Sequence, residues 1–412
     1  MSRKLIYAVA MVFFFAFSVF ATREASAVPA FARQTGMACN SCHFQHFPTL
    51  NAFGRAFKEG GYTQIGGQSL IEGDYLSLPV NLNASLVTKI RYQKRNGDSE
   101  TGSAGNLNKG EFQFPDEAAL LIGGRAGEHI GFLLEASLKD GDSRFTSFKA
   151  PIVFDTMGVK LSAIPFTTDS AGPSYGFELL NTGAVRMDRI LEHRTQTSAQ
   201  QYIGTDGAAT GASFVASKGI GYVNYTLWYP EHGDAAAGPF LNYLRVAATP
   251  TIAGWDIGGG FQLWNGTSKI GNGAAATQER ADAWAIDAQA QGTVGTLPIG
   301  VYFTYANAAK SDASEIENRY NASTVDDKTA WTILGEVGVI PNRLTLAAAY
   351  RSGKNGDPND NGQDSDNATT VGAVYNATQN LQVHVNHSFL SGDVTTDASG
   401  DQLTTVMLFA AF

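Results

Sequence analysis

The chain has 412 residues, of which 43% are hydrophobic and 16% charged, and its formal net charge is −9. This length suits one large domain or two ordinary ones. A net acidic chain argues against nucleic acid or an anionic membrane surface as a partner, so no nucleic-acid partner is expected. The charge is compatible with the attraction of cations.

The first residues predict a secretory signal peptide at 1–27, which would direct export through the Sec route. Arg3 and Lys4 precede an apolar stretch that ends at Ala21, and Ala25-Ser26-Ala27 follows. Signal peptides have this order of basic, apolar and small-residue segments. We expect cleavage after residue 27, with a retained membrane anchor as the alternative. Removal of the segment takes away three basic residues and one acidic residue, which leaves 26 basic and 37 acidic residues and a net charge of −11.

From about residue 80 onward, apolar and polar residues alternate. Leu82, Leu86 and Ile90 share one parity, whereas Lys89 and Arg91 take the other. A period of two indicates strands with one apolar and one polar face. Most of these segments have about ten residues, the length that a tilted strand needs to cross a bilayer. No apolar run of the exported chain approaches the roughly 18 residues of a membrane helix.

The connections between the strands also alternate in length. Short turns are expected at 337–342 and 376–379, and long polar loops at 307–327, 352–367 and 391–401. Short turns at one end and long loops at the other are typical of an outer-membrane barrel. A secreted β-sandwich or β-helix is the alternative, but strands of a sandwich are usually shorter.

The predicted fold class is all-β, a transmembrane antiparallel β-barrel of about 16 strands over residues 79–412. Residues 166–208 carry no strand pattern, and such a loop can fold into the lumen, as constriction loops of porins do. The chain ends on Phe412, which resembles the closing strand of bacterial outer-membrane barrels. The sixteen strands are predicted near 80–92, 111–124, 129–139, 144–155, 157–165, 209–217, 219–229, 240–250, 254–265, 280–291, 298–307, 328–338, 342–351, 367–375, 380–390 and 402–412.

The two cysteines of the chain lie in one short motif, Cys39-Asn40-Ser41-Cys42-His43. This is the C-x-x-C-H pattern of c-type haem attachment. Two thiols on one turn can each form a thioether with the porphyrin edge, and the following imidazole can bind the iron. We therefore expect one covalent haem c on Cys39 and Cys42, with His43 as an axial ligand. A disulfide, a redox dithiol and a zinc site are the alternatives.

The residues behind the motif predict a short helix, which Thr49 would cap. Phe53 and Phe57 lie at helical spacing on the side expected to face the haem, and Arg55 and Lys58 are expected to point elsewhere. The sequence thus predicts a small helical c-type haem domain over residues 28–78.

The same N-terminal stretch resembles the fused monohaem cytochrome–porins of iron-oxidising bacteria. The likeness covers Val28 to about Thr63, with PAFARQTGMAC at 29–39, the haem motif, Phe47-Pro48 and LNAFGR at 50–55. The resemblance implies a barrel in the outer membrane of a Gram-negative bacterium. It also implies an iron(II) oxidoreductase, with extracellular Fe(II) as electron donor and a periplasmic c-type cytochrome as acceptor.

Electron-transfer haems usually carry a second axial ligand, and we expect Met187 or His193 in that role. Both lie in the stretch without strand pattern, whereas Met37 and His46 are too close in sequence to His43. An open or water-bound position is the alternative. Outer-sphere electron transfer needs no catalytic acid, base or nucleophile, and none is predicted.

The position of the haem follows from the height of a barrel. The apolar band of an outer-membrane barrel is about 25 Å tall, more than one haem can span, so the haem domain is expected at or within the barrel. Two other functions remain open at this point. The donor can be a solid, an electrode or another metal, or the chain can be a passive porin whose cysteine turn is a disulfide plug.

Overall fold

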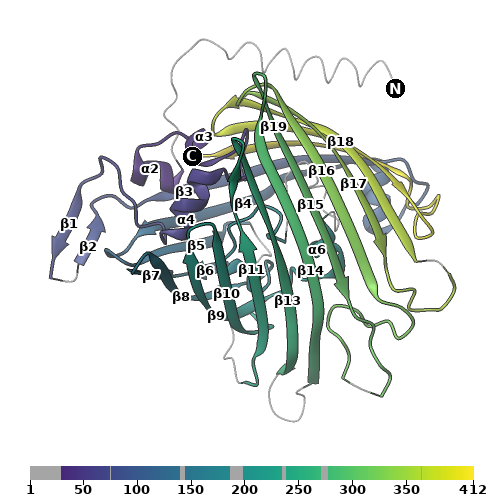
Figure 1. Cartoon of the computed structure of the whole chain (residues 1–412). Coiled ribbons are helices and arrows are strands. Elements are labelled where there is room, and N and C mark those ends of the chain that lie inside the picture. Colours follow the sequence, from purple (N-terminus) through teal and green to yellow (C-terminus); the bar gives the residue numbers. More distant parts are fainter. Residues whose placement is uncertain are drawn as a thin grey trace.

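The computed structural model describes residues 29–74, 76–139, 144–185, 198–233, 238–270, 277–314, 316–362 and 364–412. Its main body is a closed barrel of antiparallel strands (Figure 1). The predicted signal peptide lies outside the described residues.

The strands follow one another around the wall in chain order, and the last pairs with the first, with Leu408 opposite Ile90. They are β3 (Ala84–Arg95), β4 (Glu111–Arg125), β5 (Gly131–Ser137), β6 (Phe145–Lys149), β7 (Ile152–Thr156), β8 (Val159–Thr168), β9 (Ala209–Lys218), β10 (Gly221–Tyr229), β11 (Leu241–Ala248), β12 (Thr251–Ile252), β13 (Trp255–Ile270), β14 (Thr277–Val294), β15 (Leu297–Ala308), β16 (Lys328–Ile340), β17 (Leu344–Lys354), β18 (Ser365–Thr378), β19 (Leu381–Ser391) and β20 (Gln402–Ala411).

Two pairs of these segments count as single strands of the wall. β6 and β7 both pair with β8, and β12 only extends the hairpin of β11 and β13. The described residues therefore form the predicted 16-strand antiparallel barrel. The sequence predicts one continuous strand at 144–155, but the ladder breaks there because Pro151 has no backbone N–H to donate.

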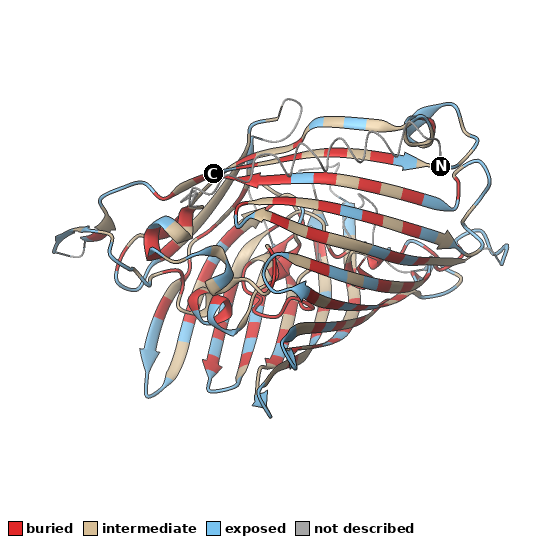
Figure 2. Ribbon diagram, turned by 90° about the horizontal axis from the view of Figure 1, so that it is seen from above, coloured by how far each residue is buried: buried red, intermediate tan, exposed pale blue. Residues whose placement is uncertain are grey.

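The barrel wall is apolar outside and polar inside, as the alternation predicts. On β3, Leu86 is exposed, whereas Lys89 and Arg91 are buried against the filled lumen. The same alternation of buried and exposed residues runs along the other strands (Figure 2). A closed sheet leaves no unpaired strand edge, and an apolar outer face suits a lipid environment.

The two ends of the barrel differ. At one end, turns of two or three residues join β7 to β8, β9 to β10, β14 to β15, β16 to β17 and β18 to β19. The first strand begins and the last strand ends at this same end. The long connections, such as those from β8 to β9 and from β15 to β16, leave and rejoin the wall at the other end. Short turns face the periplasm in bacterial outer-membrane barrels and long loops face outward, so the short-turn end is the periplasmic mouth.

Three short helices precede the barrel, α2 (Ala30–Thr35), α3 (Cys39–Cys42) and α4 (Ala52–Glu59), and a hairpin of β1 (Leu70–Gly73) and β2 (Leu76–Pro79) follows them. Figure 1 shows α3 and α4 beside the C-terminal end of the chain. The remaining helical segments lie in long loops and are α5 (Gly102–Lys109), η1 (Pro173–Tyr175) and α6 (Ala199–Ile203). No helix within the described ranges has the length and apolar character to cross a membrane.

The connection from β8 to β9 folds into the lumen. The backbone N–H of Asn181 donates to Oε1 of Gln289 over 2.8 Å, and the Thr182 hydroxyl donates to Oδ1 of Asp287 over 2.7 Å. Glu178 forms an ion pair with Arg245 of β11, with 2.9 Å between Oε2 and Nε, and both side chains are buried. These contacts fill part of the lumen with the described parts of the loop.

Candidate functional site

The cysteine motif forms the single turn of α3. The backbone N–H of His43 donates to the carbonyl of Cys39 over 3.0 Å and closes this turn. Asn51 holds the turn from the next segment, because its backbone N–H donates to the Cys42 carbonyl and its side-chain amide to the Ser41 carbonyl, each over 3.0 Å. The two thiols and the imidazole are therefore presented by one fixed piece of backbone.

Helix α4 packs against this turn and begins two residues later than predicted. Its cap is Asn51, whose Oδ1 accepts from the N–H of Gly54 over 2.9 Å. The prediction of Thr49 as the cap is wrong, since the Thr49 carbonyl instead accepts from the N–H of Phe44 over 2.8 Å in the preceding turn. Gly54 allows the close approach, because a methyl group there would overlap the Cys42 carbonyl oxygen.

The motif opens onto an apolar cavity of about 380 Å³ between the N-terminal helices and the wall of β3, β4 and β20. Phe47 stacks on Phe409 with 5.1 Å between the ring centroids, and His43 meets the edge of Phe47 at the same distance. The motif residues that line the cavity are Cys39, Cys42 and His43, and its apolar walls include Phe31, Phe47, Leu50, Phe57, Val87, Leu121, Leu133 and Phe409.

The thiols are free and not joined in a disulfide. Burial raises the pKa of both Cys39 and Cys42, and the proximity of Cys39 raises that of Cys42 further. Catalytic C-x-x-C dithiols and zinc-binding cysteines depend on a lowered pKa. This environment favours the neutral thiols and does not supply the lowered pKa of a catalytic dithiol.

The side of α4 that lines the cavity differs in part from the predicted side. Phe57 lines the cavity as expected, but Phe53 does not and is 39% exposed. Arg55 is 5% exposed, and its guanidinium contacts Asp256 of β13, with 2.6 Å between Nη2 and Oδ1. Lys58 lines the cavity instead of pointing elsewhere. The ion pair between Arg55 and Asp256 of β13 fixes the rotation of the helix about its axis. The local sequence of α4 does not show that Asp256 is the partner of Arg55.

The site is fastened to the short-turn mouth of the barrel. Gln45 accepts at Oε1 from the N–H of Asn342 over 2.9 Å, and its carbonyl accepts from the Asn376 side chain over 2.8 Å. His46 contacts Glu336 of β16, with 2.8 Å between Nε2 and Oε2, and both side chains are buried. The cavity therefore lies at the mouth that faces the periplasm.

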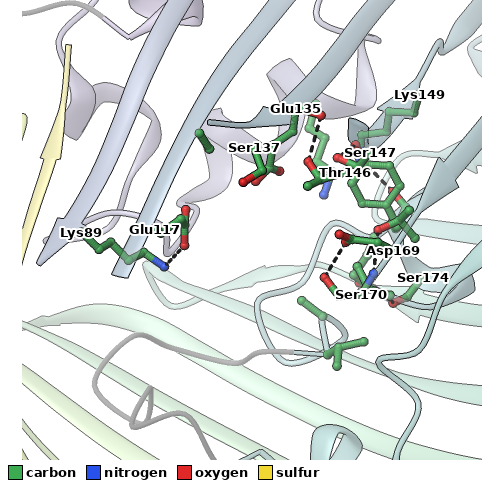
Figure 3. A pocket seen from close by; sticks show the side chains of 18 of the residues that line it. Lys89, Glu117, Glu135, Ser137, Thr146, Ser147, Lys149, Asp169, Ser170 and Ser174 are labelled. Carbon is green, nitrogen blue, oxygen red and sulfur yellow. Dashed lines mark hydrogen bonds and ion pairs between the residues drawn. The ribbon is translucent and has the colours of Figure 1, made fainter. Parts of the chain in front are cut away.

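A second cavity, of about 600 Å³, borders α4 at Lys58 and is lined mainly by polar and charged groups. Figure 3 shows Lys89 paired with Glu117, over 2.5 Å, and Asp169 accepting from Ser170. Glu135, Thr146 and Ser147 line the same space from β5 and β6. The polar cavity and the apolar cavity share Lys58 and Lys149, so they meet at these two side chains.

Solved structures of outer-membrane proteins resemble this architecture. OmpT of Vibrio cholerae is 13% identical over 84% of this chain and 100% of its own length, with a TM-score of 0.47. OmpF of Salmonella typhi is 12% identical with the same coverage and TM-score, and OccK11 of Pseudomonas aeruginosa is 13% identical over 80% and 94%, with a TM-score of 0.43. No protein-family profile and no curated protein matches the chain.

The chain has the fold of an outer-membrane porin. Sixteen described strands, an apolar outer wall and short turns at one end place this porin-like barrel in the outer membrane of a Gram-negative bacterium. Within the described residues, no three His, Cys, Asp or Glu side chains are grouped so that they could hold a metal ion.

The site also uses residues that were not singled out from the sequence or, in the case of Lys58, were predicted on another side of the helix. Lys58 and Lys149 line the cysteine cavity, and Glu336 and Asp256 of the wall hold the N-terminal helices. The alternation along the strands predicts that charged residues of the wall face the lumen. It does not predict which of these residues contacts α4. The predicted axial ligands Met187 and His193 fall in 186–197, outside the described residues.

Proposed function

We propose that this chain is an outer-membrane cytochrome–porin that carries one covalent haem c and oxidises extracellular Fe(II). Cys39 and Cys42 are the attachment points and His43 is an axial ligand. One observation carries the proposal: both thiols and the imidazole line a single cavity at the mouth of the barrel whose other walls are mostly apolar.

The residues present fit a haem. The cavity volume of about 380 Å³ falls in the range of about 300–1,000 Å³ that is usual for small-molecule sites. Phe31, Phe47 and Phe57 supply apolar surface from the N-terminal helices, and Phe409 supplies it from the wall. When bound, the haem supplies a one-electron acceptor at the iron. The protein side chains hold it and keep water from its faces.

The two ends of the barrel suit different partners. A periplasmic c-type cytochrome can approach the cavity closely, because the cavity lies at the short-turn mouth. Fe(II) comes from the opposite side and must travel down the lumen, since the apolar band of about 25 Å separates the cavity from the exterior. The polar cavity, with Glu117, Glu135 and Asp169 on its walls, lies on that route. Carboxylates attract a divalent cation, and no proton transfer is required of them.

Met187 or His193 remains the proposed second axial ligand. The described segments on both sides of 186–197 lie in the lumen, where Val185 and Ala199 are buried. Met37 lines the cavity and is tested alongside them, although it lies close to His43 in sequence. Optical spectra of Met37→Ala, Met187→Ala and His193→Ala proteins should change only in the variant that loses the ligand. Unchanged spectra in the Met187 and His193 variants contradict this assignment.

The function is tested by mixing the purified protein with ferrous ion without oxygen while the haem absorption is recorded. The parent protein should become reduced, and a Cys39→Ala/Cys42→Ala protein should carry no covalent haem. A parent mass without an added tetrapyrrole contradicts the proposal and leaves a passive porin. If the haem accepts electrons from an electrode or another metal but not from Fe(II), only the assignment of Fe(II) as the electron donor is contradicted.

A further inference from the structure

We infer that Lys58 of α4 and Lys149 of β6 form the binding site for the two propionate carboxylates of the haem. This inference rests on the proposed function, because it concerns the group that Cys39 and Cys42 are proposed to hold. It assigns to the cavity a second recognition element, separate from the thiols and the axial imidazole.

Among the described residues that line the apolar cavity, Lys58, Lys149 and His43 are the basic side chains. No Asp or Glu is among these residues. Lys149 is only 4% exposed. Its ammonium donates to the Tyr175 carbonyl over 2.8 Å and lies 4.4 Å from the centroid of the Tyr175 ring. Lys58 is half-buried and comes from the helix that holds the cysteine turn. Both therefore bring a basic group to a cavity whose walls are mostly apolar.

Neither ammonium is neutralised by a carboxylate in the structure as described. Lys89 and Lys160 of the same barrel contact Glu117 and Glu59, but Lys58 and Lys149 have no carboxylate within ion-pair distance among the described residues. The charge of Glu178 acts on Lys58, yet Glu178 itself contacts Arg245. An ammonium has three donors, of which the Tyr175 carbonyl takes one at Lys149.

This arrangement costs free energy without an anion. A charged group removed from water is destabilising unless it is paired, and burial lowers the pKa of Lys58 for this reason. The two ammonium groups also repel each other. A ligand that brings two negative charges on one edge removes both penalties, and each carboxylate can accept charge-assisted hydrogen bonds. The haem of a c-type site has such an edge, because its two propionates are not used in thioether attachment.

The lysines also fix where this anion site lies. Both line the polar cavity as well as the apolar one, so the site is at the boundary between the two spaces. Figure 3 shows Lys149 at the polar cavity. The apolar side suits a porphyrin plane, and the polar side suits its carboxylates.

The test compares Lys58→Met and Lys149→Met with Lys89→Met as the matched control. Lys89 is a buried lumen lysine that lines only the polar cavity and contacts Glu117. Covalent haem content and heat-modifiable gel migration verify attachment and barrel folding. The midpoint potential should fall in the Lys58 and Lys149 variants, because loss of a nearby positive charge favours the ferric state. Redox difference infrared spectra should show shifted carboxylate bands. Lys149→Arg keeps the charge and should retain the parent potential.

The possible outcomes separate this inference from the proposed function. If the parent carries no haem, the proposed function fails and the propionate site fails with it. If haem is attached but the potential and carboxylate bands of the Lys58→Met and Lys149→Met proteins equal those of the Lys89→Met protein, the propionate site alone is overturned.

Discussion

At Gly54 the backbone of α4 passes against the carbonyl oxygen of Cys42, with no room for a side chain. The contact sets the distance between the helix and the turn that carries both thiols. A single residue without a side chain therefore decides whether Phe57 and Lys58 reach the same cavity as Cys39 and Cys42.

Gly54→Ala is expected to separate α4 from the cysteine turn. Overpacking at such a contact typically costs about 1–3 kcal/mol, so the N-terminal helices should become more sensitive to protease. The fraction of protein with covalent haem should fall as well. Gly60→Ala is the matched control, since a methyl group there would lie 3.4 Å from the nearest atom, the Ala56 carbonyl oxygen. Equal protease resistance of the two variants would contradict this role of Gly54.

At the scale of secondary structure elements, β16 holds the N-terminal segment through one buried histidine–carboxylate contact. His46 contacts Glu336, whose other carboxylate oxygen accepts from the Tyr302 hydroxyl over 2.6 Å. Arg55 with Asp256 of β13 is a second attachment on another part of the wall. The N-terminal segment is thus held by carboxylates on two strands, β13 and β16, which are separated by β14 and β15.

His46→Leu is expected to loosen this attachment, because it leaves the Glu336 carboxylate buried without its cationic or imidazole partner. Breaking one side of a buried pair commonly costs about 3–5 kcal/mol, whereas apolar replacement of both sides is often nearly neutral. Limited proteolysis of the N-terminal helices should therefore increase in His46→Leu and recover in His46→Leu/Glu336→Leu. The single Glu336→Leu variant is measured as well. If the increase in cleavage of the double variant equals the sum of the increases in the two single variants, the contact between His46 and Glu336 is not the anchor.

The strands were predictable from sequence and the orientation of α4 was not, for a physical reason. Whether Leu86 faces lipid and Lys89 faces the lumen depends on local alternation along β3, which the sequence displays directly. Which side of α4 meets the cavity depends on the contact between Arg55 and Asp256, which are 201 residues apart. The cysteine motif needs no such distant partner to be recognised, because its spacing alone forms the turn.

At the scale of the whole molecule, the proposed electron path depends on the orientation of the barrel in the outer membrane. The cysteine cavity lies at the short-turn mouth, and the polar cavity lies deeper in the lumen, toward the long loops. An inverted barrel would present the cavity to the exterior and the polar route to the periplasm. Fe(II) and a periplasmic cytochrome would then be on the wrong sides.

Two cysteine substitutions test this orientation of the barrel. Met157 lies in the turn between β7 and β8 and is 96% exposed, and Asp360 lies exposed in the long loop between β17 and β18. On intact cells, a membrane-impermeant maleimide should label Asp360→Cys and leave Met157→Cys unlabelled. After the outer membrane is permeabilised, both should react. In the haem-loaded protein Cys39 and Cys42 are proposed to be thioethers, which do not react with maleimide, and labelling of the parent protein measures the background. Labelling of Met157→Cys but not Asp360→Cys on intact cells would mean that the cysteine cavity faces outward, which the proposed path does not allow.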